Sequence, residues 1–138
     1  MTKIVYNATY GGFSLSDEAI MRYAEIKGIT LYRENEQFLT SYYLCPPEEW
    51  DRIHNEELDA PEGPDRFVRS NALYFSTRDI ERNDPALVQV VEELGDKANG
   101  DYAKLRIAEV PAGDLYRIDE YDGYESVETK DTYDWKVA

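Results

Sequence analysis

The sequence predicts an α+β fold, a mostly antiparallel sheet with two to three helices packed on it, in one domain over residues 1–138. Three observations lead to this prediction. The length is that of one ordinary domain, and 42% of the residues are apolar, which is enough for a core. Short β-branched and aromatic runs, separated by turn residues, alternate with a few segments of helical periodicity.

The N-terminal third is expected to contain a strand, a tight turn and a helix. Residues 3–7 are β-branched and aromatic, as in a strand. The pair Gly11-Gly12 indicates a turn or a close approach of the backbone. Ser16 is a suitable N-cap for a helix with carboxylates in its first turn. Gly28 is a natural residue to end that helix.

Strands are also expected in the central region. Residues 29–33 and 38–43 are predicted to be two strands, with the polar residues 34–37 joining them. Residues 66–77 are predicted to be one or two further strands.

An acidic helix is expected between these strands. Pro46 or Pro47 would open it, because proline suits the first turn of a helix, and it would reach about Leu58. Helical periodicity places Trp50, Ile53 and Leu58 on its inner face.

The strongest helical signal follows. Asp84 is an N-cap with Pro85 behind it, and the helix is expected to end near Gly95. Apolar side chains recur within it at the i, i+3, i+4 and i+7 positions: Leu87, Val90, Val91 and Leu94. Residues 103–110 are then expected to form a strand.

Asp122-Gly123 predicts a β-hairpin with a two-residue type I′ turn. In that register Tyr121 faces Tyr124 and Glu120 faces Glu125. The next pairs outward are Asp119 with Ser126, Ile118 with Val127, and Arg117 with Glu128. The aromatic, apolar and opposite-charge pairs support the register, whereas the pair of glutamates opposes it.

The net charge of −14 disfavours direct binding to nucleic acid or to an anionic membrane, and favours a basic partner or simple solubility. Two blocks carry most of it, residues 34–62 with a net charge of −8 and residues 107–138 with −6. No apolar run is long enough for a membrane span, and no signal peptide is recognised. With a single cysteine, these features suggest a cytoplasmic protein.

Catalytic and metal sites are not expected, and neither is a cofactor. His54, the only histidine, is interpreted as a solvated side chain on the acidic helix. Cys45, the only cysteine, is interpreted as a buried core residue. An enzyme of unknown reaction therefore remains only as the last alternative.

The carboxylates near the Asp122-Gly123 turn are the principal candidate for binding a partner. Their crowding would suit a basic surface and could imitate the charge density of a nucleic acid, although the interpretation as a solvated hairpin tip is slightly favoured over imitation. This set is Asp119, Glu120, Asp122, Glu125, Glu128, Asp131 and Asp134. The alternative acidic set lies on the helix near Trp50: Glu48, Glu49, Asp51, Glu56 and Glu57.

A small-molecule site is the second class of function considered. The glycine turn could bring backbone N–H groups to an anion, and an arginine cluster could grip a nucleotide signal while tyrosines stack on its base. The residues of this alternative are Tyr10, Gly11, Gly12, Arg66, Arg69 and Arg78, with Arg82 nearby in sequence. The competing interpretations are a structural turn and ion pairs with the acidic blocks.

Four stretches, residues 4–16, 90–98, 104–111 and 118–123, resemble a family of small phage and prophage proteins. The family's N-terminal motif, (C/T)-Y-G-G-F-x-L-S, is here Thr9-Tyr10-Gly11-Gly12-Phe13-Ser14-Leu15-Ser16. Its members usually carry cysteine where Thr9 stands, and their C-terminal tails are more basic. The resemblance brings no catalytic residue with it. It implies a phage origin, and hence the expectation of an accessory protein that inhibits host defence by binding a basic host protein or a nucleic-acid-binding complex.

Overall fold

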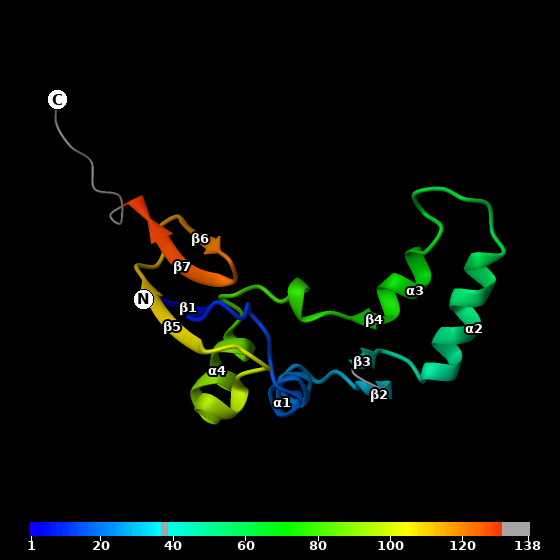
Figure 1. Cartoon of the computed structure of the whole chain (residues 1–138), viewed down its shortest axis with the longest axis horizontal. Helices are drawn as coiled ribbons and strands as arrows, with labels where there is room; N and C mark the ends of the chain where they lie inside the picture. The colour runs from blue at the N-terminus through cyan, green and yellow to red at the C-terminus, as the bar shows by residue number, and fades with distance from the viewer. Residues whose placement is uncertain (37–38, 131–138) are drawn as a thin grey trace. The chain divides into compact units, whose positions relative to one another are not determined.

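The computed structural model describes residues 1–36 and 39–130 (Figure 1). It has an α+β fold with antiparallel strand pairing, as predicted. The chain divides into two compact units: unit 1 is Met1–Ile26 together with the chain from Thr77 onward, and unit 2 is Lys27–Ser76. The single domain expected from the sequence stays a prediction. No helix within the described ranges is long and apolar enough to cross a membrane.

Unit 1 contains two antiparallel strand pairs. β1 (Thr2–Asn7) pairs with β5 (Leu105–Val110), and β6 (Tyr116–Tyr121) pairs with β7 (Tyr124–Thr129). β7 lies beside β1 (Figure 1), and a side-chain contact described below joins them. The core of unit 1 includes four side chains with no exposed area. They come from β1 and from the helix Pro85–Leu94: Ile4, Val5, Leu87 and Val90.

The helices of unit 1 begin and end where the local signals predict. α1 (Asp17–Lys27) begins after Ser16, whose hydroxyl oxygen accepts the Ala19 N–H at 3.1 Å. Gly28 follows α1 with a φ of +71°, a conformation that suits glycine. α4 (Pro85–Leu94) begins after Asp84, whose carboxylate accepts the Ala86 N–H at 2.9 Å.

The C-terminal hairpin has the predicted register. Tyr121 pairs with Tyr124 and Glu120 with Glu125, and the pairing continues to Tyr116 and Thr129. Asp122 and Gly123 both have positive φ, +50° and +88°, as a type I′ turn requires.

Unit 2 contains a three-stranded sheet in the order β2-β3-β4, formed by β2 (Tyr32–Glu36), β3 (Leu39–Tyr43) and β4 (Tyr74–Phe75). The first strand was expected at residues 29–33, with 34–37 as a polar connection. It runs instead through residue 36, and Glu34 pairs with Ser41. Backbone pairing continues there through polar residues, because polar side chains on an exposed strand cost the ladder little.

The prediction for residues 66–77 is wrong over most of its length. This stretch forms the helix α3 (Val68–Leu73), and only β4 is a strand. α3 is held by α2 (Pro47–Leu58): the Glu57 carboxylate accepts the Ser70 N–H at 2.8 Å, and the Trp50 indole donates to the Ser70 carbonyl at 2.9 Å. Contacts 13 and 20 residues away in sequence thus override the local strand preference.

The inner face of α2 also differs from the prediction. Leu58 is 45% exposed, while Glu57 is buried. One stripe of α2 carries Trp50, Ile53 and Glu57, at the spacing i, i+3 and i+7. Leu58 follows Glu57 by one residue, so its side chain points about 100° away from that of Glu57 around the helix axis. His54 was expected to be a solvated surface side chain, but it is half-buried: its ring stacks on those of Trp50 and Phe67, with centroid distances of 4.7 and 5.2 Å.

Candidate protein-binding surface at the hairpin end of unit 1

Glu125 lies inside unit 1, although the sequence places it in the candidate acidic surface. The residue is only 6% exposed. Its carboxylate accepts two hydrogen bonds from the Arg82 guanidinium, at 2.6 and 2.9 Å, and one from the Asn7 backbone N–H at 2.8 Å. These bonds satisfy a charge that would otherwise be costly to bury. Glu125 is therefore part of the interior and does not belong to a surface that a partner could contact.

Arg82 has further contacts that hold it beside β1. Its guanidinium carbon lies 3.6 Å from the centroid of the Phe13 ring, and its backbone carbonyl accepts the Val5 N–H at 2.9 Å. The guanidinium explains how Glu120 and Glu125 can occupy opposed positions. One of the two charges is neutralised inside the fold, so the repulsion expected between them is relieved.

Asn7, at the end of β1, connects three segments of unit 1. It has no exposed area. Its side-chain amide donates to the carbonyl of Thr9 at 2.8 Å and to that of Gly123 at 2.9 Å. Its side-chain oxygen accepts the Lys104 N–H at 2.8 Å. The glycine turn, the hairpin turn and the loop before β5 are therefore tied to one buried amide.

The same three segments are packed closely against each other. The Thr9 hydroxyl donates to the Tyr102 carbonyl at 2.6 Å. A Cβ atom added at Gly11 would overlap the Tyr102 carbonyl oxygen, and one added at Gly123 would lie 2.5 Å from the Tyr10 carbonyl oxygen. Gly11 and Gly123 are thus required by close backbone approach. This packing supports the structural interpretation of the glycine turn.

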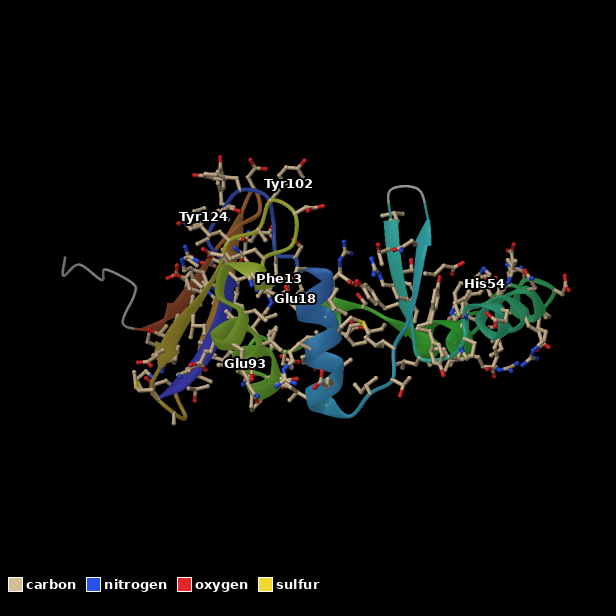
Figure 2. All side chains as sticks on the ribbon, turned by 90° about the horizontal axis from the view of Figure 1, so that it is seen from below. Phe13, Glu18, His54, Glu93, Tyr102 and Tyr124 are labelled. Atoms are coloured by element: carbon tan, nitrogen blue, oxygen red, sulfur yellow. The ribbon has the colours of Figure 1, made fainter. Side chains whose placement is uncertain are left out.

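Four exposed tyrosines surround this packed point, and we call them the tyrosine surface: Tyr10, Tyr102, Tyr121 and Tyr124. Their exposed fractions are 66%, 85%, 78% and 41% in that order. The rings of Tyr10 and Tyr124 lie 5.3 Å apart, and Tyr121 is the strand partner of Tyr124. Tyr102 and Tyr124 extend from the same end of unit 1 (Figure 2). Sequence reasoning assigned Tyr10 to another site and did not identify the surface.

Three exposed carboxylates lie on the segments that carry these tyrosines. Asp101 precedes Tyr102, and Glu120 and Asp122 flank Tyr121. Within residues 1–36 and 39–130, none of the three has an ion-pair partner. We call this set the acidic group.

The other carboxylates predicted for this surface have different surroundings. Asp119 is exposed, but it pairs with Arg117 at 3.3 Å. Glu128 is half-buried and accepts a hydrogen bond from the Ser126 hydroxyl at 2.8 Å. Asp131 and Asp134 lie outside the described residues. The row of charges expected along the hairpin is therefore interrupted.

The alternative acidic set on α2 is split in the same way. Its exposed members are Glu48, Glu49, Asp51 and Glu56. Glu56 pairs with Arg52 at 2.9 Å and with Arg69 at 3.3 Å. Glu57 was expected on the surface, but it is buried, and its carboxylate accepts the Ser70 N–H of α3. The remaining three, Glu48, Glu49 and Asp51, offer a second exposed acidic patch in unit 2.

The residues proposed to bind a nucleotide are divided between the units. Arg66 and Arg69 belong to unit 2, whereas Tyr10, Gly11, Gly12 and Arg78 belong to unit 1. The Arg66 guanidinium donates to the Glu57 and Leu58 carbonyls, and Arg69 pairs with Glu56. Arg66 pairs with Glu62 at 3.8 Å, and Arg82 pairs with Glu125, so Arg66, Arg69 and Arg82 form ion pairs with the acidic blocks, as the competing interpretation predicted.

Cys45 is buried, as predicted. Burial raises the pKa of its thiol, and the nearby Glu49 carboxylate raises that pKa further, so the thiolate is disfavoured. In the described part of the chain, no group of three or more His, Cys, Asp and Glu side chains is arranged to hold a metal ion.

Comparison of the chain with known proteins gives no match to a protein-family model, a curated protein or a solved structure.

Proposed function

We propose that this chain is a phage-encoded accessory protein that inhibits a host anti-phage system by binding a basic surface of a host protein or nucleic-acid-binding complex. One observation carries the binding part of the proposal: one end of unit 1 holds four exposed tyrosines and three exposed carboxylates that have no ion-pair partner among the described residues. The phage and anti-defence parts rest on the resemblance of residues 4–16, 90–98, 104–111 and 118–123 to phage proteins.

Tyrosines and carboxylates have complementary roles in such a surface. Tyrosine is enriched in the centres of protein interfaces because it contributes a large, rigid contact area and a polar hydroxyl. The acidic group and the net charge of −14 would steer a basic partner toward that area, which speeds association and makes it sensitive to salt.

A mixed contact of this kind is better supported than imitation of a nucleic acid. Imitation needs a regular row of charges, and the hairpin lacks one because Glu125 is buried and Asp119 is paired with Arg117. Sequestration of a nucleotide is less well supported, because Arg66, Arg69 and Arg82 are engaged within the protein.

Two variants with equal changes in charge test the proposal. The first replaces the acidic group, with Asp101→Asn, Glu120→Gln and Asp122→Asn. The second replaces the patch in unit 2, with Glu48→Gln, Glu49→Gln and Asp51→Asn. Each removes three negative charges, so a difference between them reports position and not net charge. Partners are captured from a bacterial lysate at low salt, and the Kd of the purified partner is then measured for each variant.

We expect the unit 1 variant to weaken binding about tenfold or more and the unit 2 variant to weaken it only slightly, since close charge pairs contribute about 1.5 kcal/mol or more. Equal losses, or a larger loss in the unit 2 variant, would contradict the assignment of the surface. The inhibitory part is tested in cells: expression of the parent chain should restore phage plating on a defended host, and the unit 1 variant should not.

A further inference from the structure

We infer that the tyrosine surface recognises arginine: its occupant is an arginine-bearing segment of the basic partner, whose guanidinium groups stack on the exposed rings while the acidic group balances their charge. This inference rests on the proposed function, because it specifies the chemistry of the partner at the same surface. The inference also goes beyond the proposed function, because a partner surface rich in lysine would agree with the proposed function but would contradict the inference.

The rings are available for such contacts without rearrangement of the backbone. Asn7 ties the three tyrosine-bearing segments together, and Thr9 and Gly11 hold the Tyr102 loop. Tyr102 and Tyr121 are the most exposed members, at 85% and 78%, so their faces are open to a partner. A surface that is already ordered loses little entropy on binding.

Charge and ring chemistry together select the occupant. A flat cation can lie on an aromatic face and still donate in-plane hydrogen bonds to a carboxylate, and guanidinium is the side chain with that shape. An ammonium is a compact, strongly hydrated charge that stacks less well. In the sequence, Asp101 adjoins Tyr102, and Glu120 and Asp122 adjoin Tyr121, so the acidic group lies on two of the segments that carry the exposed rings.

Unit 1 already holds one guanidinium in this manner. Arg82 lies over the Phe13 ring at 3.6 Å and makes two hydrogen bonds to the Glu125 carboxylate. This internal example shows that the combination of aromatic face and carboxylate is stable in this protein. The tyrosine surface offers exposed aromatic rings and the acidic group on the same end of unit 1.

Two synthetic probes test the inference directly. One is a fluorescent peptide with eight arginines separated by Gly-Ser spacers, and the other is the same peptide with lysine in place of arginine. Their Kd values are measured by anisotropy at moderate salt for the full chain. We expect the parent protein to bind the arginine peptide about fivefold or more tightly than the lysine peptide, as cation–π contacts at exposed sites suggest.

Ring removal and ring retention are compared in matched variants. Tyr121→Ala with Tyr102→Asn removes two rings, and asparagine tolerates the positive φ at Tyr102. Tyr121→Phe with Tyr102→Phe keeps both rings. Tyr32→Ala, in unit 2, is the control for loss of an exposed tyrosine elsewhere. Melting temperatures establish that each variant is folded.

The ring-removal variant should bind the arginine peptide about five- to thirtyfold more weakly than the parent, and the phenylalanine variant should bind within about twofold of it. Equal binding of the two peptides, or unchanged binding after ring removal, would overturn the inference. In that case the unit 1 charge variant still decides the proposed function: if it alone loses the captured partner, the basic-surface proposal stands without arginine selectivity.

Discussion

Glu120 and Glu125 occupy opposed positions in the hairpin, yet their environments differ because only Glu125 contacts Arg82. The buried carboxylate has three hydrogen bonds, and the exposed one has no ion-pair partner within the described ranges. At this scale, two identical side chains at opposed positions of one hairpin have different roles. Glu125 stabilises the fold, and Glu120 is free to contact a partner.

Replacement of these two residues should therefore have unequal effects on stability. Glu125→Gln leaves the Arg82 guanidinium without its carboxylate, and we expect the free energy of unfolding to fall by about 2–3 kcal/mol, because Arg82 keeps some exposure to water. Glu120→Gln should change it by less than about 0.5 kcal/mol. Urea unfolding of both variants measures the difference. Equal stability of the two variants would mean that the ion pair does not contribute.

At the scale of elements, side-chain pairs join α1 to α4 within unit 1. The Arg22 guanidinium donates to the Glu93 carboxylate at 2.8 and 3.2 Å, and the Tyr23 hydroxyl donates to Asp84 at 2.7 Å. Glu93 projects from α4 (Figure 2). Hydrogen bonds from Arg22 and Gln89 lower the pKa of Glu93 from 4.5 to about 2.

This lowered pKa predicts a contribution to acid sensitivity. The folded state binds the Glu93 proton less readily than the unfolded state does, so the contribution to stability is present above about pH 4.5 and is lost as the pH falls toward 2. Glu93→Gln cannot be protonated and should lose less stability between pH 5 and pH 2.5 than the parent does. Urea midpoints at the two pH values provide the measurement.

Glu109→Gln serves as the control, because Glu109 is exposed and has no ion-pair partner among residues 1–36 and 39–130. It should show the same acid sensitivity as the parent. If Glu93→Gln behaves like this control, the Arg22–Glu93 pair does not couple stability to pH.

At the scale of the whole molecule, the chain is organised as two compact units, and residues 77 onward return to the unit that the N-terminus begins. α1 ends at Lys27, the residue with which unit 2 begins. Each unit has its own buried side chains, for example Ile4 in unit 1 and Ile53 in unit 2.

The sequence-based prediction of one domain requires that both units unfold together. Trp50 reports on unit 2, and Trp135→Phe would leave it as the only tryptophan. In that variant, Trp50 fluorescence and far-UV circular dichroism should give the same urea midpoint. Two separate midpoints would show that the units are independent domains.

Much of the fold was predictable because its signals are local. Ser16 and Asp84 cap helices through bonds to residues two or three positions away, and Asp122-Gly123 sets the hairpin register through its own backbone conformation. Such features depend on a few neighbouring residues, and any chain with that sequence carries them.

The sequence by itself therefore determined the α+β class, the capped helices α1 and α4, the C-terminal hairpin and the strong negative charge. Only the tertiary structure decided that α3 is a helix, that Glu125 and Glu57 are interior, and that the exposed tyrosines gather at one end of unit 1. The physical reason is the same for each. A buried carboxylate is stable only if hydrogen-bond donors contact it, and here those donors come from residues distant in sequence. The tyrosine surface likewise forms only because separate segments pack together. Both outcomes therefore depend on contacts between residues far apart in sequence.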